Sequence, residues 1–409
     1  MPSPELTRDD RRRVLGAVLR SVERKFMGLD VDIAALRRTH EAQVLDGTTA
    51  EEFEAAVNAM LRSLGTSHVG FFRGDRPRVA GRVAIAATFM RVATPDGERW
   101  MFQDVHPGGP AAEAGIAPGD VLLTIDGKDV VPPEGLPFGL GSAYTFTVRR
   151  RDGTTVQPTI DVPVSKDRKR PIVVPGQVVT ARRLDEGIGV VRVSMFPGVL
   201  GMDVARDISR AVAELTADRL IIDLRGNTGG GIGCLRPMSL LCADSRGVGY
   251  SVGRSIARRG FNKNDLPRFD RIPSSQLGVL PLIFRFALAK RSIAVFTEGL
   301  GPQPHHGHTA ILVNEHSASA AEMVAAFASE TGLATVVGTR TPGRLVAASS
   351  FKVGHGYRVA LPVAAYYTWN GTNLEGRGVE PDIPAPLAPE ALWFGEDNQL
   401  ETACGAITP

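Results

Sequence analysis

The stretch Ala310-Ile311-Leu312-Val313-Asn314-Glu315-His316-Ser317-Ala318-Ser319-Ala320-Ala321-Glu322-Met323 decides the α/β character of the second half of the chain. Its first four residues form an apolar run that predicts a buried strand, and residues 320–330 predict a helix that ends at Gly332. Ser319 therefore lies at a strand-to-helix junction, where its hydroxyl is exposed and backbone N–H groups can face a developing oxyanion. Ser319 and Glu322 also fit a capping box, so a nucleophile and a plain N-cap both remain open at this point.

A second strand-to-loop junction precedes this one. Residues 219–225 predict a buried strand that runs into Gly226-Asn227-Thr228-Gly229-Gly230-Gly231, where backbone can approach a ligand closely. The loop lacks the lysine of a P-loop and the GxGxxG spacing. With a strand at 188–193 and a helix at 203–215, the pattern from about residue 172 onward is α/β. The stretch 241–305 is irregular with an apolar middle at 277–289, as in a lid or a partner-binding insertion.

The first part of the chain predicts helices from residue 5 to about residue 75. Thr49 and Glu52 form a capping box, apolar residues then recur at helical spacing over 53–64, and Gly65 ends the helix. The next residues are Thr66-Ser67-His68. We expect a small helical N-terminal domain with one apolar face over residues 1–77.

Between residues 78 and 165 the pattern changes to short strands, predicted at 83–86, 100–105 and 145–148. Residues 107–127 predict a short helix, a tight glycine turn and a strand that ends in Asp-Gly. This order resembles a PDZ domain, and the resemblance implies binding of an extended peptide at a sheet edge. After the charged linker 165–171, residues 166–409 form the expected α/β catalytic core, with an insertion at about 241–305.

The composition limits the classes of partner. The chain has 409 residues, of which 43% are hydrophobic and 22% charged, and a formal net charge of only +3. This small charge does not favour binding to nucleic acid or to an anionic membrane. Three cysteines form neither a disulfide framework nor a metal knuckle. The first residues contain no apolar signal-peptide segment, so we expect a cytoplasmic protein without a membrane span.

Four pieces in this order resemble one serine-peptidase family, the carboxyl-terminal processing peptidases and the catalytic core of tricorn protease. They are the PDZ-like module, Asp223–Gly231, Ser317–Glu322 and Leu374-Glu375-Gly376-Arg377-Gly378-Val379-Glu380-Pro381-Asp382-Ile383, and the resemblance covers roughly residues 30 to 390. It implies a multidomain α+β protein with a helical N-terminal domain, a PDZ-like β domain and an α/β core of the ClpP/crotonase-like type. It also implies that Ser319 is the nucleophile.

The family activates its serine with a lysine in one branch and a histidine in the other. Where the lysine of the first branch is expected, this chain has Thr341-Pro342-Gly343-Arg344. Burial can turn a lysine into a base, but arginine stays protonated in proteins, so Arg344 excludes a Ser–Lys dyad. Ser67 and His68 match the Ser-His pair of the tricorn-like branch, and Glu375 matches its glutamate.

The roles that follow are those of a serine hydrolase. We expect His68 to accept the proton of Ser319, and Ser67 and Glu375 to orient it. The N–H groups of Ala320 and of either Gly229 or Gly230 are expected to form the oxyanion hole.

Several alternatives stay open beside these roles. His68 can be a hydrogen-bonded core histidine and Glu375 an ordinary turn carboxylate. His316 is a rival base by proximity. Arg344 is a candidate for binding a substrate carboxylate. A histidine cluster, His305, His306 and His308, has neither a helical nor a zinc-ribbon spacing, so no metal site and no cofactor are expected.

The sequence thus predicts a serine peptidase that acts on flexible or C-terminally recognised polypeptides. The alternative is a catalytically silent ligand- or peptide-binding protein on the same scaffold, favoured by the missing lysine and the apolar 277–289 segment. Assembly into homo-oligomers is compatible with both. The two differ in whether His68 and Glu375 converge on Ser319.

Overall fold

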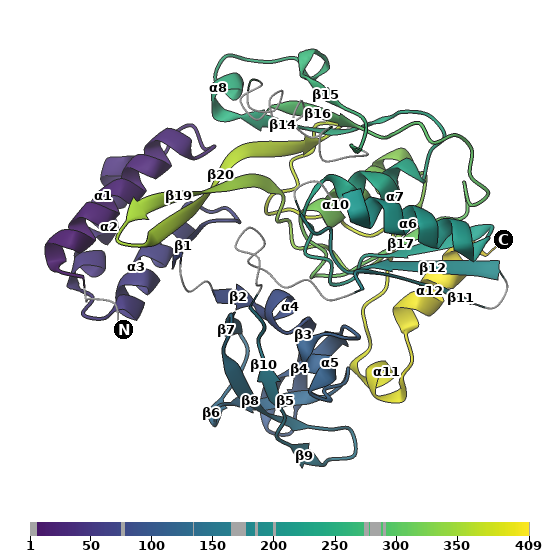
Figure 1. Cartoon of the computed structure of the whole chain (residues 1–409), viewed down its shortest axis with the longest axis horizontal. Helices are drawn as coiled ribbons and strands as arrows, with labels where there is room; N and C mark the ends of the chain where they lie inside the picture. Colours follow the sequence, from purple (N-terminus) through teal and green to yellow (C-terminus); the bar gives the residue numbers. More distant parts are fainter. Residues whose placement is uncertain are drawn as a thin grey trace.

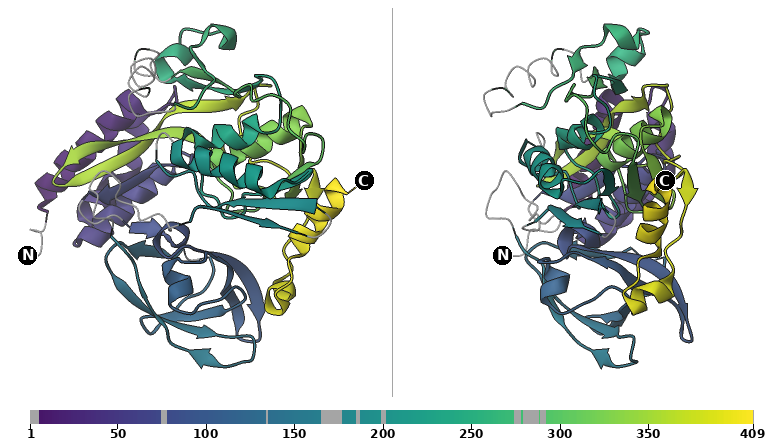
Figure 2. Two further views of the ribbon diagram at one scale, coloured as in Figure 1. Left: turned by 45° about the vertical axis from the view of Figure 1, so that its right-hand side comes forward. Right: turned by 90° about the vertical axis from the view of Figure 1, so that its right-hand side faces the viewer.

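The computed structural model describes residues 6–74, 78–133, 135–164, 177–184, 187–198, 202–273, 278, 288 and 292–408. Three groups of elements follow one another along the chain: N-terminal helices, a small β-rich unit and a larger α/β unit (Figure 1). The views in Figure 2 place the β-rich unit against one side of the α/β unit. The predicted linker at 165–171 lies outside the described residues.

Three helices form the N-terminal part. They are α1 (Arg8–Lys25), α2 (Ile33–Asp46) and α3 (Ala50–Arg62). The predicted capping box at Thr49 and Glu52 is confirmed, and Gly65 follows the end of α3 with φ +66°. The apolar faces of α1 and α3 pack on a C-terminal hairpin and share one core with its residues 353–361. The helices are therefore anchored to a part of the chain that lies almost 300 residues later.

The β-rich unit contains a seven-stranded antiparallel sheet and a two-stranded one. Its elements are β2 (Arg78–Ala80), α4 (Gly81–Ala84), β3 (Ala87–Thr94), β4 (Gly97–Val105), α5 (Pro110–Glu113), β5 (Val121–Ile125), β6 (Lys128–Asp129), β7 (Pro137–Gly139), β8 (Ala143–Arg149), β9 (Thr155–Val156) and β10 (Thr159–Asp161). The strand predicted at 83–86 is wrong, because Gly81–Ala84 form a helical turn. A short apolar run is compatible with a strand or with a helical turn, and burial in the folded protein decides between the two.

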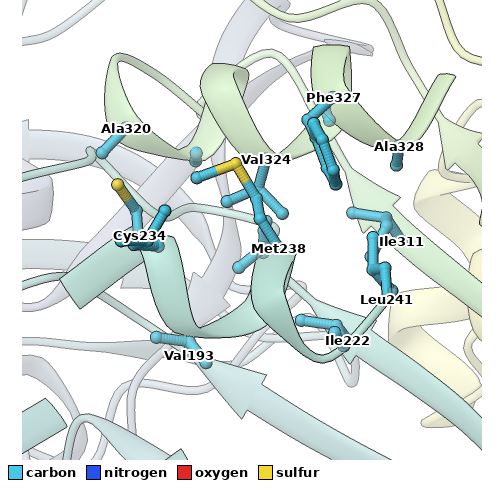
Figure 3. Packing of buried hydrophobic residues seen from close by; sticks show 14 of the residues in the cluster. Val193, Ile222, Cys234, Met238, Leu241, Ile311, Ala320, Val324, Phe327 and Ala328 are labelled. Carbon is cyan, nitrogen blue, oxygen red and sulfur yellow. The ribbon is translucent and has the colours of Figure 1, made fainter. Parts of the chain in front are cut away.

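The α/β unit is built on a six-stranded sheet in the order β11-β12-β13-β17-β18-β21. Its strands are β11 (Val179–Arg183), β12 (Ile188–Val193), β13 (Arg219–Asp223), β17 (Thr309–Val313), β18 (Thr335–Gly338) and β21 (Ile383–Pro384). One face carries α6 (Met202–Leu215), α7 (Leu235–Ser239) and α10 (Ala320–Thr331), and the other carries α12 (Asn398–Ile407), preceded by α11 (Pro389–Phe394). Figure 3 shows α7 and α10 packed over the sheet through Met238, Val324 and Phe327.

A second six-stranded sheet joins the insertion to the rest of the chain. It contains β1 (Gly70–Arg73), β14 (Gly247–Gly253), β15 (Arg268–Phe269), β16 (Ile293–Phe296), β19 (Val346–Gly354) and β20 (Tyr357–Thr368), and α8 (Arg254–Ala257) follows β14. The prediction that 241–305 is irregular is therefore wrong for β14 and β16, which pair with each other. Most of the apolar segment 277–289 lies outside the described residues.

Two features of this architecture bear on the site. Strands β13 and β17 are adjacent and parallel, so the loops that follow them emerge at the same edge of the sheet. Within the described part of the chain, no helix is both long and apolar enough to span a bilayer.

Candidate active site

The turn between β17 and α10 holds Ser319 in a conformation that side chains rarely adopt. Both flanking elements predicted from the sequence are confirmed, and Gly332 ends α10 in the left-handed conformation. Ser319 is the N-cap of the helix with φ +56° and ψ −117°. Such strained backbone persists where surrounding contacts fix it and is typical of functional sites. Here the fixing contact is the carboxylate of Glu322, which accepts a 2.8 Å hydrogen bond from the Ser319 N–H.

The glycine-rich loop after β13 packs directly against this turn. A side chain at Gly229 (φ +88°) would place its Cβ 2.6 Å from the Cβ of Ser319 and 2.8 Å from the Ala320 nitrogen. Asn227 joins the two segments, because its carbonyl accepts from the Ala318 N–H at 2.8 Å and its side chain donates to the Val193 carbonyl. Only glycine therefore fits at position 229.

The backbone donors of the loop decide between the two predicted oxyanion candidates. The Gly229 N–H donates to the side-chain oxygen of Asn227 at 2.7 Å, so it is not available to a ligand, and this half of the prediction needs correction. Among the described residues, neither Gly230 nor Ala320 uses its N–H in a hydrogen bond. The short Asx turn at Asn227 occupies the N–H of Gly229, the first of the two glycine donors, and a glycine pattern alone does not reveal such a turn.

Ser67, His68 and Glu375 meet, although more than 300 residues separate the pair from the glutamate. The Ser67 Oγ lies 2.7 Å from the His68 Nδ1 and donates to the Glu375 Oε2 at 3.0 Å. The other carboxylate oxygen accepts from the Ser67 N–H at 2.5 Å and from the Thr66 hydroxyl at 2.9 Å. Glu375 thus fixes the whole Thr66–Ser67 segment.

The direction of these hydrogen bonds sets the tautomer of His68. A serine hydroxyl has one proton, and Ser67 donates it to the carboxylate. Its oxygen then accepts from the Nδ1–H of His68, which leaves the Nε2 of the neutral ring as a proton acceptor. Among the described residues the Nε2 has no hydrogen bond, and none joins it to Ser319.

Glu322 connects the serine turn to the segment that carries Arg344. Besides the Ser319 N–H, its buried carboxylate accepts from the Thr341 hydroxyl at 2.8 Å, the Gly343 N–H at 2.7 Å and the Arg344 N–H at 2.8 Å. Burial raises the pKa of Glu322, and these hydrogen bonds oppose that shift. The sequence indicated Glu322 as a capping residue but not as the centre of this network.

The next residue, Leu345, connects this network to the carboxylate that orients His68. The Leu345 N–H donates to the Glu375 Oε2 at 3.0 Å, one residue after the N–H that Glu322 holds. Two adjacent peptide groups therefore link the cap of Ser319 with the carboxylate that orients His68. Desolvation lowers the pKa of His68; Glu375 opposes the shift, and the cation of Arg344 adds to it. Neutral imidazole is thus the dominant form at neutral pH.

His316, His305 and His306 form hydrogen bonds with groups outside the Ser67–His68–Glu375 relay. The Nε2 of His316 lies 2.9 Å from the Phe89 carbonyl of β3, so this rival base is bound to the β-rich unit. The Nε2 atoms of His305 and His306 both lie 3.0 Å from the Leu240 carbonyl.

Comparison with known proteins finds two families to which parts of this chain are similar. A model described as peptidase family S41 matches residues 187–385, and a PDZ domain model matches residues 101–136. The carboxyl-terminal-processing protease of Synechocystis is 26% identical over 378 residues, which are 88% of this chain and 77% of that protein. Tricorn protease homolog 1 of Streptomyces coelicolor is 24% identical over 305 residues, which are 72% of this chain and 24% of that protein.

The fold is shared with solved structures of low sequence identity. The photosystem II D1 C-terminal processing protease has a TM-score of 0.56 at 18% identity, and each chain is covered to 97%. Mature CPAF complexed with lactacystin has a TM-score of 0.58 at 15% identity, covering 98% of this chain and 97% of that one.

The curated relatives differ from this chain in length. It spans 59% of the carboxy-terminal-processing protease of Bartonella bacilliformis, to which it is 26% identical over 300 residues (71% of this chain). The matched models, the shared order of motifs and the common fold agree with one another: residues 187–385 are similar to peptidase family S41 and residues 101–136 to a PDZ domain.

Proposed function

We propose that the chain is a serine peptidase in which Ser319 is the nucleophile and His68 the general base. The observation that carries the proposal is the Glu375–Ser67–His68 hydrogen-bond relay, which leaves the His68 Nε2 free to accept a proton. Glu375 accepts four hydrogen bonds, and two of them come from Ser67, the residue whose hydroxyl contacts the His68 ring.

In the proposed reaction, the Ser319 Oγ attacks the carbonyl carbon of a peptide bond while its proton moves to the His68 Nε2. The N–H groups of Gly230 and Ala320 donate to the oxyanion. When the carbon–nitrogen bond breaks, His68 gives this proton to the leaving amine. A water molecule, deprotonated by His68, then hydrolyses the acyl-enzyme ester and regenerates Ser319.

Ser67 and Glu375 stabilise the charged intermediate of this cycle. The imidazolium keeps its Nδ1–H bonded to Ser67, whose own proton remains on the side of the carboxylate. The missing His68–Ser319 hydrogen bond is compatible with the proposal, because such bonds often tighten only when substrate binds.

The domain organisation is part of the proposal. We assign residues 1–77 to the helical domain that supplies Ser67 and His68, 78–165 to the PDZ-like domain and 166–409 to the catalytic core. The PDZ-like domain contacts the serine turn through His316 and through Gln103, whose amide donates to Glu315 at 3.0 Å. These contacts support a role in gating the site as well as in recruiting substrate tails.

The remaining assignments concern substrate and setting. Arg344 is exposed beside His68 and is proposed to bind the carboxylate of a substrate C-terminus. This role predicts that Arg344→Ala raises KM for peptides with a free C-terminus but not for their amidated forms. A cytoplasmic location and homo-oligomer formation remain proposals from the sequence.

The test is cleavage of an unfolded polypeptide such as reduced, alkylated casein, with products identified by mass spectrometry. The purified chain is compared with Ser319→Ala and with Ser67→Ala. Cleavage that is lost in the first variant and strongly reduced in the second supports the proposed roles. Intact casein that nevertheless binds to a folded wild-type chain would favour the silent binding protein instead.

A further inference from the structure

A hollow of about 520 Å³ lies between α1 and the β19–β20 hairpin, and the candidate active site does not use it. Five cationic side chains line it: Arg20, Arg24, Lys25, Lys352 and Arg358. Among the described residues that line the hollow, none has an acidic side chain. We call these five residues and the hollow between them the basic groove. Figure 1 shows α1 alongside this hairpin, and the apolar face of the helix packs on it.

The cations of the basic groove are placed at a cost to local stability. Arg20 and Arg24 are four residues apart on α1, where like charges repel. Lys352 of β19 is directly opposite Arg358 of β20, which is again a repulsive pair. Within the described part of the chain, none of the five forms an ion pair, although Arg358 donates to the hydroxyl and to the backbone carbonyl of Ser350. Two separate elements thus direct uncompensated positive charge at one hollow.

The shape of the groove indicates what can lie in it. Three consecutive residues of β19, Ser350, Phe351 and Lys352, line the hollow. Side chains of neighbouring strand residues point to opposite faces, so a hollow that all three touch lies along the edge of the strand. Among the described strands, β19 pairs only with β20, and its other edge has no partner strand. Unpaired backbone groups at an edge are a template for an added strand.

We propose that the basic groove binds an acidic segment of a polypeptide as an added strand along the free edge of β19. The cations select the charge of the segment, and the strand edge selects an extended peptide backbone. Nucleic acid or lipid could satisfy the charges, but neither can complete a β-ladder. The net charge of +3 offers no general attraction for polyanions, so selection rests on this local cluster.

The groove is suitably placed to serve the proposed peptidase. Strand β19 begins directly after Leu345, whose N–H holds Glu375. At about 3.3 Å per residue, the seven steps from Leu345 to Lys352 span roughly 23 Å. An extended substrate could therefore present an acidic segment to the groove while a bond some seven residues away lies near Ser319. This use as an exosite rests on the proposed function, whereas binding of the acidic segment does not.

The experiment measures binding of fluorescein-labelled peptides to the full chain carrying Ser319→Ala, by fluorescence anisotropy at low salt. The probe alternates glutamate and valine. A matched peptide has glutamine in place of glutamate, and another is interrupted by proline. The test variant is Arg24→Glu with Lys352→Glu, and its control is Lys128→Glu with Arg206→Glu, two exposed cations elsewhere on the surface. Oligothymidylate and phosphatidylserine vesicles test the other polyanions.

We expect the glutamate peptide to bind, the test variant to weaken it about tenfold, and the control variant to leave it unchanged. The proline peptide should bind as weakly as the glutamine one. The reversals relieve the like-charge pairs, whereas a glutamate at position 24 opposes the helix dipole in the last turn of α1, so thermal unfolding of the test variant checks that it is folded. Equal binding of the glutamate and glutamine peptides, or equal binding by both variants, overturns the proposal. Tighter groove-dependent binding of oligothymidylate or vesicles overturns the choice of a polypeptide. Since the assay uses Ser319→Ala, it gives the same result whether or not the wild type cleaves peptides.

Discussion

Glu322 offers the sharpest test of how the serine turn is held. Its two carboxylate oxygens each accept two hydrogen bonds, from the N–H groups of Ser319 and Arg344 on one side and from Thr341 and Gly343 on the other. In Glu322→Gln, one oxygen becomes an amide nitrogen that cannot accept. Two donors then lose their partner, and each buried unsatisfied donor costs about 1–3 kcal/mol. We therefore expect a loss of about 2–6 kcal/mol of unfolding free energy.

The assay is urea denaturation followed by fluorescence, with Glu380→Gln as the matched control. Glu380 forms a 3.0 Å ion pair with Arg340 and is 71% exposed, so the same chemical change there should cost at most about 1 kcal/mol. Under native conditions, Glu322→Gln should also slow the reaction of Ser319 with a fluorophosphonate, because its backbone is no longer fixed. If both variants unfold at the same urea concentration, the network around Glu322 does not hold the turn.

Three further predictions concern pH, the glycine loop and the domain contact. The acid limb of kcat/KM should lie below the ordinary histidine pKa of 6.5, because the folded protein lowers the pKa of His68. Arg344→Met removes a nearby cation, favours the imidazolium and should move the limb to higher pH, whereas Glu375→Gln should move it to lower pH. A limb that does not respond to either change would exclude His68 as the base. Gly229→Ala should abolish peptide cleavage and fluorophosphonate labelling, since the new Cβ overlaps the nucleophile's own; unchanged labelling would show that the loop does not contact the serine turn in solution. Asp104→Asn should destabilise the fold by about 3–5 kcal/mol, because it leaves the buried Arg82 and the half-buried Arg192 without the carboxylate they share. A denaturation midpoint equal to that of the wild type would contradict this.

The sequence predicts those parts of the fold and site whose information is local. The apolar run before Ser319, the helix that ends at Gly332 and the capping box at Thr49 are confirmed, because periodicity and end signals are read within one segment. The prediction of a strand at 83–86 is wrong, because four apolar residues do not distinguish a strand from a helical turn.

The contacts between distant segments were less accessible from the sequence. Resemblance to a family brought Ser67 and Glu375 into one hypothesis, but nothing local shows that Leu345 also donates to that carboxylate. The capping box predicts one of the four hydrogen bonds that Glu322 accepts, the one from Ser319. The other three come from a loop about twenty residues later. Likewise, the Asx turn that occupies the Gly229 N–H depends on the side-chain conformation of Asn227, which a glycine pattern does not encode.

The proposed function depends on the activation of Ser319 by His68. The most direct measurement is the rate of fluorophosphonate labelling of the purified chain, with the modified residue identified by mass spectrometry, beside Ser319→Ala and His68→Ala. We expect labelling of the wild type at Ser319 and none in either variant, with all three proteins folded by circular dichroism. Labelling that persists at the wild-type rate in His68→Ala, or that falls on another residue, would contradict it.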